Sequence, residues 1–236
     1  MVGHRAHARA HDPGDAGSKS ARTRERILDA AAHVLSRKGY AGTRLSDVAD
    51  RAEIQTPAIY YYFASRDDLV EEVMWSGLAR LREYVTGVLA ALPPGAGPLD
   101  RIDAAVEAHL RYSLEISDYT TASIRNAGQV PESVAIRPTA EASRYGDMWR
   151  KMLQEADQPG PLRPDLDPVA ARMMILGALN SAAEWWNPRR GSIEVVVRTA
   201  QSLVKHGLGP AAGSRADQAV SGARPRSPGR RRRPPR

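Results

Sequence analysis

The chain has 236 residues and a formal net charge of +7. With 42% apolar residues it can bury a sizeable core, while the absence of cysteine excludes disulfides, thiolate metal sites and cysteine nucleophiles. Residues 1–20 lack the apolar segment of a signal peptide, and no apolar run approaches the roughly 20 residues of a membrane span. We therefore expect a soluble, cytoplasmic protein.

The positive charge lies at the two ends of the chain. Residues 209–236 hold eight arginines and one aspartate, which accounts for the whole net charge. This tail has too few large apolar residues to offset its ordering entropy, so we predict that it is disordered. Two interpretations of the tail remain: it attracts nucleic acid non-specifically, or it is a solvated extension without a specific role. Residues 1–19 are likewise predicted to be a disordered arm.

The predicted elements in the first half are all helices, because no segment shows sustained period-2 alternation. A first helix runs from about residue 20 to Gly39, where glycine favours a helix end. Thr43 is expected to cap a second helix, and a short third helix covers 56–63. Ser65 then caps a long amphipathic helix that reaches about residue 92.

The second half continues with helices separated by proline-containing loops. Pro138 is expected to break a helix, because proline removes a backbone donor. Asp167 followed by Pro168 predicts an N-cap and first helical position. The predicted helices cover 99–116, 118–128, a short stretch before Pro138, a longer stretch that carries Trp149, 168–186 and 192–206.

The stretch TRLSDVADRAEIQTPAIYYYFASRDDLV (43–70) has the layout of a helix-turn-helix. Two short helices are joined by a tight turn around Glu53 and Ile54, and the second helix of such a pair enters the major groove of DNA. Ile59 and Phe63, four positions apart, should face inward. The segment therefore predicts a DNA-binding domain over residues 20–66.

Three consecutive tyrosines on this short helix cannot share one role, because successive helical side chains point about 100° apart. We expect Tyr60 and Tyr61 to face DNA phosphates and Tyr62 to lie on the flank. The N-terminal residues 56–58 are expected to point into the groove, where the Pro57 ring can contact a thymine methyl. The alternative is a core helix with its phenols at the rim.

This region resembles the TetR/AcrR family of bacterial regulators. The residues that carry the resemblance are Ile27, Leu28, Ala30, Ala31, Gly39, Tyr40, Thr43, Leu45, Ser46–Ala52, Ile54, Ile59–Phe63 and Ser65–Leu69.

The resemblance implies a DNA site in which Thr43 caps the second helix and touches a phosphate, and Arg66 meets the DNA backbone. Two departures stand out. Glu53 occupies a turn position where glycine is usual, which costs about 1 kcal/mol if φ is positive, and Tyr62 replaces a common histidine. The implied DNA-binding residues are Thr43, Arg44, Gln55, Thr56, Pro57, Ala58, Tyr60, Tyr61, Tyr62 and Arg66.

For residues 67–208 the resemblance implies a helical ligand-binding and dimerisation domain, with a homodimer formed through 168–206. Ordinary intramolecular packing is the alternative for that last helix pair. Each candidate pocket residue also has a structural alternative: a satisfied core histidine, core aromatic filling, or an arginine that complements a helix C-terminus. The candidates for ligand binding are His109, Arg125, Asn126, Tyr145, Trp149 and Trp185.

The function that the sequence predicts is a ligand-responsive transcriptional regulator of all-α fold. We expect a homodimeric repressor, bound to a pseudo-palindromic double-stranded operator on the nucleoid. A small hydrophobic or acyl-CoA-type effector is expected to release it. An activator of the same fold and a helical protein-interaction module are the alternatives. We expect no enzyme, metal, cofactor or membrane partner, since the sequence shows no nucleophile elbow, phosphate loop or metal-ligand pair.

Overall fold

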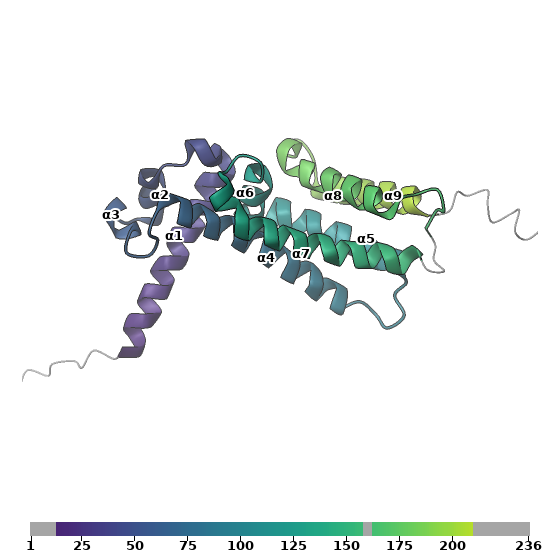
Figure 1. Ribbon diagram of the computed structural model, residues 1–236, viewed down its shortest axis with the longest axis horizontal. Coiled ribbons are helices and arrows are strands. Elements are labelled where there is room, and N and C mark those ends of the chain that lie inside the picture. Colours follow the sequence, from purple (N-terminus) through teal and green to yellow (C-terminus); the bar gives the residue numbers. More distant parts are fainter. Residues whose placement is uncertain (1–12, 158–161, 210–236) are drawn as a thin grey trace, which may run out of the picture.

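The computed structural model describes residues 13–157 and 162–209. Every regular element within those ranges is helical, which confirms the all-α prediction (Figure 1). No helix in the described ranges is both long and apolar enough to cross a membrane. The N-terminal helices form a head at one end of the molecule, and the longer helices extend away from it as a second layered bundle.

The head consists of α1 (Pro13–Gly42), α2 (Leu45–Ala52) and α3 (Thr56–Ile59). The predicted disordered arm is wrong for residues 13–19, which are helical. Pro13 suits a first helical position. Residues 1–12 lie outside the described part. Gly39 interrupts α1 as predicted, with φ 69° and ψ 175°, a conformation that favours glycine.

The turn between α2 and α3 contains a glutamate in a left-handed conformation. Glu53 has φ 55° and ψ 48°, which is the positive φ on which the expected backbone cost depends. Its N–H donates to the Asp50 carbonyl at 3.2 Å, and the Ile54 N–H donates to the Ala49 carbonyl at 3.0 Å. Arg26 of α1 donates to the Ala52 carbonyl. Helix α2 therefore ends in a fixed turn despite the strain.

Helix α3 is shorter than the predicted 56–63. It ends at Ile59 and continues as a tight turn, in which the N–H of Tyr60 reaches the Pro57 carbonyl at 3.3 Å and that of Tyr62 reaches the Ile59 carbonyl at 2.9 Å. Helical backbone cannot continue through Ser65, which is extended with φ −149° and ψ 170°. Ser65 caps the next helix, because its Oγ accepts from the Asp68 N–H at 3.0 Å.

The remaining elements follow the predicted order. Side-chain N-caps form at Ser65, Ser117, Asp167 and Ser192. These elements are α4 (Arg66–Ala90), α5 (Pro98–Arg111), the π-helix η1 (Tyr112–Ile116), α6 (Asp118–Asn126), α7 (Glu132–Asp157), α8 (Pro168–Trp185) and α9 (Ile193–Leu208).

Two helix predictions need correction. Helix α7 runs through Pro138 without a break. The Pro138 side chain is buried, and one missing amide near the start of a long packed helix is outweighed by that burial. The predicted helix 99–116 changes at Tyr112 into a π-helical turn, whose last residue precedes the Ser117 cap.

The side chains pack into two cores that cross the predicted domain boundary. The core of the head includes Leu69 and Met74 from α4, together with Tyr119 and Ala122 from α6. The second core surrounds Trp149 and joins α4, α5, α7, α8 and α9. The head therefore does not end at residue 66, because α4 and α6 complete its core.

Helices α4 and α6 cross closely at Gly77. A Cβ at this position would lie far inside van der Waals distance of Ser123 Oγ and of the Tyr119 carbonyl. With no side chain there, Ser123 Oγ lies 2.7 Å from the Met74 carbonyl, and Thr120 Oγ1 donates to the Gly77 carbonyl at 3.1 Å. The side chains of α6 thus bond directly to the backbone of α4.

We expect Gly77→Ala to lower the free energy of unfolding by about 1–3 kcal/mol, because the added methyl overpacks the crossing. The control is Gly87→Ala in the same helix, where a Cβ would meet nothing within 4 Å. That substitution should raise the stability by about 0.5–1 kcal/mol through helix propensity. Chemical denaturation measures both values. Equal effects at the two positions would contradict the close crossing.

A second expectation concerns the strained turn. Glu53→Gly should raise the free energy of unfolding by about 0.5–1 kcal/mol, because glycine adopts positive φ without a Cβ clash. Glu53→Ala removes the same carboxylate but keeps the Cβ, so it should bring no such gain. If thermal melting shows alanine to be as favourable as glycine, charge rather than backbone strain governs this position.

Candidate DNA interface and effector cavity

The aromatic residues of the head divide between surface and core as the helical spacing predicts. Tyr61 is 82% exposed and Tyr60 is 57% exposed, whereas Ile59 and Phe63 are buried. Tyr62 is half-buried against the core of the head, and its ring meets that of Tyr61 edge-to-face with centroids 5.1 Å apart. Two phenols therefore project freely beside α3, while the third supports them.

The residues around the start of α3 are also accessible to solvent. Gln55 and Pro57 are exposed, and Thr56 and Ala58 are partly exposed. Arg44 is exposed at the start of α2, and it makes no ion pair within the described part of the chain. This surface offers hydroxyl, amide and guanidinium donors, which are the groups that contact phosphates and base edges.

Thr43 does not have the predicted role. The N-cap of α2 is Arg44, without a side-chain cap, and Thr43 is buried with its hydroxyl donating to the Gly39 carbonyl at 2.7 Å. The hydroxyl proton already hydrogen-bonds the Gly39 carbonyl at the kink of α1, so it is not free to bond a phosphate.

Arg66 is also used inside the fold. Its Nε donates to the Thr43 carbonyl at 2.9 Å, another guanidinium nitrogen donates to the Tyr40 carbonyl, and a third lies 3.3 Å from Asp67 Oδ1. The guanidinium stacks 4.2 Å from the centroid of the Tyr40 ring. Arg66 therefore fastens the start of α4 to the loop before α2, where the sequence had predicted contact with the DNA backbone.

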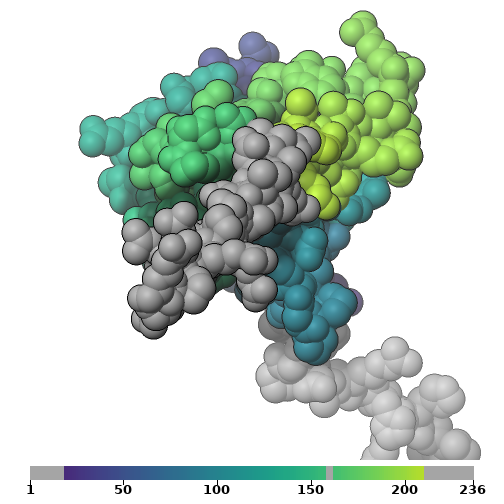
Figure 2. All heavy atoms as spheres, turned by 90° about the vertical axis from the view of Figure 1, so that its right-hand side faces the viewer, coloured from purple at the N-terminus to yellow at the C-terminus, as the bar shows by residue number. Residues whose placement is uncertain are grey.

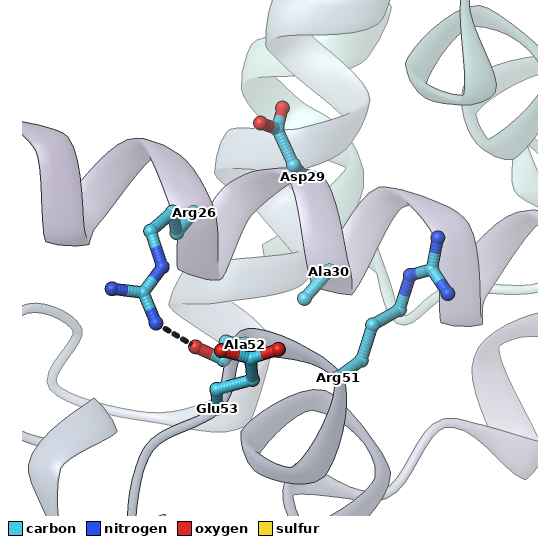
Figure 3. Close-up of a pocket in the computed structure, with 6 residues that line it drawn as sticks. All are labelled: Arg26, Asp29, Ala30, Arg51, Ala52 and Glu53. Carbon is cyan, nitrogen blue, oxygen red and sulfur yellow. Dashed lines mark hydrogen bonds between the residues drawn. The ribbon is translucent and has the colours of Figure 1, made fainter.

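A shallow polar hollow of about 410 Å³ lies behind the turn of the head (Figure 3). It is lined by Arg26, Asp29 and Ala30 of α1 and by Arg51–Glu53 at the end of α2. Arg26 points to the Ala52 carbonyl, whereas Arg51 extends away on the other side. The lining is mostly charged, and the guanidinium of Arg26 supports the turn that precedes α3.

A larger cavity of about 620 Å³ lies in the second half of the chain, between α4, α6, α7 and α8. Its wall is apolar at Leu78, Leu81, Ile124 and Leu176, and two arginines contribute positive charge. The lining residues are Leu78, Leu81, Ser123, Ile124, Ala127, Thr139, Ala142, Ser143, Tyr145, Gly146, Asp147, Arg150, Arg172, Met173, Leu176, Gly177 and Asn180.

Three of the predicted ligand residues lie at this cavity or directly behind its wall. Tyr145 lines it, and the Tyr145 hydroxyl lies 2.9 Å from His109 Nδ1. Trp149 is fully buried and meets the Tyr145 ring edge-to-face, with centroids 6.4 Å apart. Burial lowers the pKa of His109 to about 4 and raises the pKa of Tyr145, so both side chains are neutral at neutral pH.

The other three predicted ligand residues lie elsewhere. Arg125 joins α6 to its neighbours by donating to the Ser36 carbonyl at 2.9 Å and to the Ala183 carbonyl. Asn126 is buried and accepts from the Tyr40 N–H at 2.7 Å. Trp185 is 59% exposed on α8, away from the cavity lining. Their sequence positions on α6 and α8 do not reveal which face each side chain takes.

Sequence reasoning missed Arg150, Arg172 and Asn180 in the cavity wall. Arg172 and Asn180 are two of three lining residues that recur every fourth position on α8, with Leu176 between them, a spacing that marks one helix face. That pattern is present in the sequence, but the family resemblance assigns the whole of α8 to the dimer interface.

The outer face of α8 and α9 is apolar. Met174 is 76% exposed and Leu203 is 71% exposed, and Trp185 and Val195 lie with Leu203 around a groove of about 410 Å³. Figure 2 shows this helix pair, in yellow-green, forming one side of the second bundle. Large contiguous apolar patches of this kind mark sites of protein association.

Comparison with known proteins places both halves of the chain in one family. Residues 27–73 match the model of bacterial regulatory proteins of the tetR family, and residues 95–208 match the tetracyclin repressor-like C-terminal domain. The transcriptional repressor KstR2 of Mycobacterium tuberculosis is 28% identical over 181 residues, which cover 73% of this chain and 85% of KstR2.

Two solved structures share the fold. PfmR, a TetR family regulator from Thermus thermophilus, has a TM-score of 0.67 at 25% identity and covers 80% of this chain and 98% of its own. AibR in complex with isovaleryl coenzyme A and operator DNA has a TM-score of 0.69 at 19% identity, covering 78% and 96%. The chain belongs to the TetR family of bacterial transcriptional regulators.

Proposed function

We propose that this regulator is a homodimeric repressor, released from its operator by an acyl-CoA thioester. Its family and relatives share DNA binding, a response to a ligand and repression. We propose in addition the effector class, the residues that contact DNA and the dimer interface. A regulator of this kind acts on DNA, so we place its action in the cytoplasm, on the nucleoid.

The observation that carries the proposal is that two helices serve both the head and the cavity. Leu78 and Leu81 of α4 line the cavity, and the same helix begins at Arg66, which holds the loop before α2. Ser123 and Ile124 of α6 line it as well, while Asn126 at the end of α6 holds the kink of α1. A molecule that spreads this cavity must displace elements that position the head.

The cavity chemistry supports an anionic effector with an apolar part. The wall is largely apolar, which suits an acyl group, and Arg150 and Arg172 add guanidinium groups that match phosphate oxygens. Arg150 is exposed and pairs with Asp147 at 3.0 Å, so it is free to exchange this partner for a phosphate. The AibR complex with isovaleryl coenzyme A supports the same class by analogy.

The apolar face of α8 and α9 supports the homodimer. It exposes Met174, Trp185 and Leu203, and its small residues Ala178 and Ala182 let a second helix pair approach closely. A second copy of the chain would bury this face through residues 168–206. A two-fold dimer in turn reads a pseudo-palindromic operator, with half-sites about one helical turn apart.

At the DNA surface, we propose that residues 56–58 face the bases and that Tyr60, Tyr61 and Arg44 meet phosphates. Gln55 joins this set because it is exposed beside Thr56. Thr43 and Arg66 support the surface from within, and Tyr62 supports Tyr61. The direct test is a gel-shift titration with DNA that flanks the protein's own gene. Absence of any bound fragment stronger than random DNA would remove the operator from the proposal.

Two substitutions should separate charged from uncharged phosphate contacts. Arg44→Ala should weaken operator binding and flatten the plot of log K against log salt by roughly one unit, because one fewer counterion is released. Tyr61→Phe should weaken binding without changing the slope. The control is Lys151→Ala, which removes one exposed charge late in α7, the helix that extends away from the head (Figure 1). Fluorescence anisotropy at several salt concentrations measures all three.

A slope that Arg44→Ala leaves unchanged would show that this guanidinium does not reach a phosphate. A change of slope in Lys151→Ala would show that the salt effect reflects overall charge and not a contact.

The effector site makes a separate prediction. Arg150→Gln should raise the octanoyl-CoA concentration that half-releases the operator roughly tenfold, because a charge-assisted hydrogen bond to phosphate is lost. Lys151→Gln removes a neighbouring positive charge that does not line the cavity, so the release concentration should not change. If both substitutions raise the release concentration equally, Arg150 contributes only to the overall positive potential of the protein and does not contact the phosphate.

A further inference from the structure

The kink of α1 at Gly39 separates two backbone groups that a continuous helix would pair. In an unbroken helix the Tyr40 N–H would donate to the Ser36 carbonyl, four residues earlier. Here the Tyr40 N–H donates to Asn126 Oδ1 at 2.7 Å, and the Ser36 carbonyl accepts from Arg125 at 2.9 Å. Two consecutive residues of α6 therefore satisfy both groups.

The guanidinium of Arg125 also holds the end of α8. The last four carbonyls of a helix have no partner within the helix, and Arg125 donates to one of them, the Ala183 carbonyl. Its Nε lies 3.5 Å from Glu184 Oε1, and a cation at this place also complements the helix dipole. Arg125 thus joins the kink of α1 to the last turn of α8, at the end of that helix nearer the head (Figure 1).

The same turn of α8 belongs to the apolar face that we assign to the dimer. Trp185 follows Ala183 by two residues, is 59% exposed and lines the groove between α8 and α9. One helical turn therefore meets the head through a backbone carbonyl and presents a large aromatic ring to a second copy of the chain. A movement of the head relative to this face must stretch the hydrogen bonds of Arg125.

This link bears on how a dimer reads DNA. In a two-fold dimer that packs through α8 and α9, the position of each head is fixed relative to the α8 of its own protomer. One added base pair moves a half-site by about 3.4 Å and rotates it by about 34° around the DNA axis. Heads that are held firmly to α8 therefore accept one spacing, whereas loosely held heads adapt to several.

We propose that Arg125 determines which half-site spacing the regulator accepts, by fixing the kink of α1 to the end of α8. Arg125 is a positioning residue in this role, because it acts through the backbone of α1 and α8 and not through DNA. The inference rests on the proposed function, since it assumes a homodimer through residues 168–206 and operator binding by the head.

The test uses three operators that differ only in the distance between half-sites: the natural spacing, one base pair fewer and one base pair more. Fluorescence anisotropy measures the affinity for each. The wild-type protein should bind either altered operator about tenfold more weakly than the natural one, because one head is then misplaced in its groove. Arg125→Met keeps a long side chain that favours helix but removes every donor, and it should reduce this ratio to about threefold or less.

A matched control separates this link from the general stability of the head. Arg80 joins α4 to α1 by an ion pair with Glu25 at 2.7 Å and lies over the Tyr119 ring. Arg80→Met removes a guanidinium of comparable exposure that bonds to the head, and it should keep the wild-type ratio. The ratio is taken within one variant, so a uniform loss of affinity cancels, and thermal melting reports folding. If Arg125→Met does not fold, Arg125→Gln carries the test, because it stays polar but is too short to reach both carbonyls.

A second measurement follows the heads without DNA. The chain has no cysteine, so Asp50→Cys, at an exposed position on α2, places one spin label on each head of the dimer. Electron–electron double resonance should give a narrow distance distribution in the otherwise wild-type protein and with Arg80→Met. Adding Arg125→Met should broaden the distribution.

The outcomes separate this inference from the proposed function. If Arg125→Met keeps both the wild-type ratio and the narrow distribution, or if Arg80→Met lowers the ratio equally, Arg125 does not set the spacing and the regulator remains a dimeric repressor. Equal binding of the wild-type dimer to all three operators overturns the inference in the same way. A chain that stays monomeric in analytical ultracentrifugation, or that binds no operator, overturns the proposed function and this inference with it.

Discussion

The close crossing of α4 and α6 at Gly77 is the constraint on which the rest of the structure depends. Because this position has no side chain, Ser123 and Thr120 bond to backbone carbonyls of α4. The two helices therefore behave as one packed unit. Ser123 is also part of the cavity wall, so the hydroxyl that ties the helices together lies where an effector would bind.

From this crossing the two helices diverge toward different parts of the head. Helix α4 begins with Arg66, which holds the backbone at Thr43 and Tyr40. Helix α6 ends with Asn126, which accepts the Tyr40 N–H, and Tyr119 near its start donates to Asp29 of α1 at 2.8 Å. Helix α4 is thus only half of the connection between the cavity and the head. Helix α6 contacts α1 directly, so a shift of either helix reaches the kink at Gly39 and, through it, the presentation of α3.

Sequence patterns predicted those features that depend on local chemistry. The caps at Ser65 and Asp167 follow from residue type and spacing, as does the burial of Ile59 and Phe63, and the family resemblance pointed to the strained turn at Glu53. Features that depend on tertiary packing were not accessible in the same way. Pro138 lies within a helix because its burial outweighs a missing amide, and Arg66 turns inward because carbonyls and an aromatic ring surround it. Of the six candidate ligand residues only Tyr145 lines the cavity, because part of its wall comes from α6 and α8.

We propose that effector binding in the cavity and operator binding at the head are linked by one coupling free energy, which α4 and α6 transmit. Isothermal titration of octanoyl-CoA into the free protein and into its complex with operator DNA tests it most directly. By linkage, the factor by which the thioester weakens operator binding must equal the factor by which the operator weakens thioester binding. We predict equal factors of about a hundredfold, which corresponds to roughly 2.7 kcal/mol. The same thioester affinity for free and operator-bound protein would contradict the account, however tightly the thioester binds.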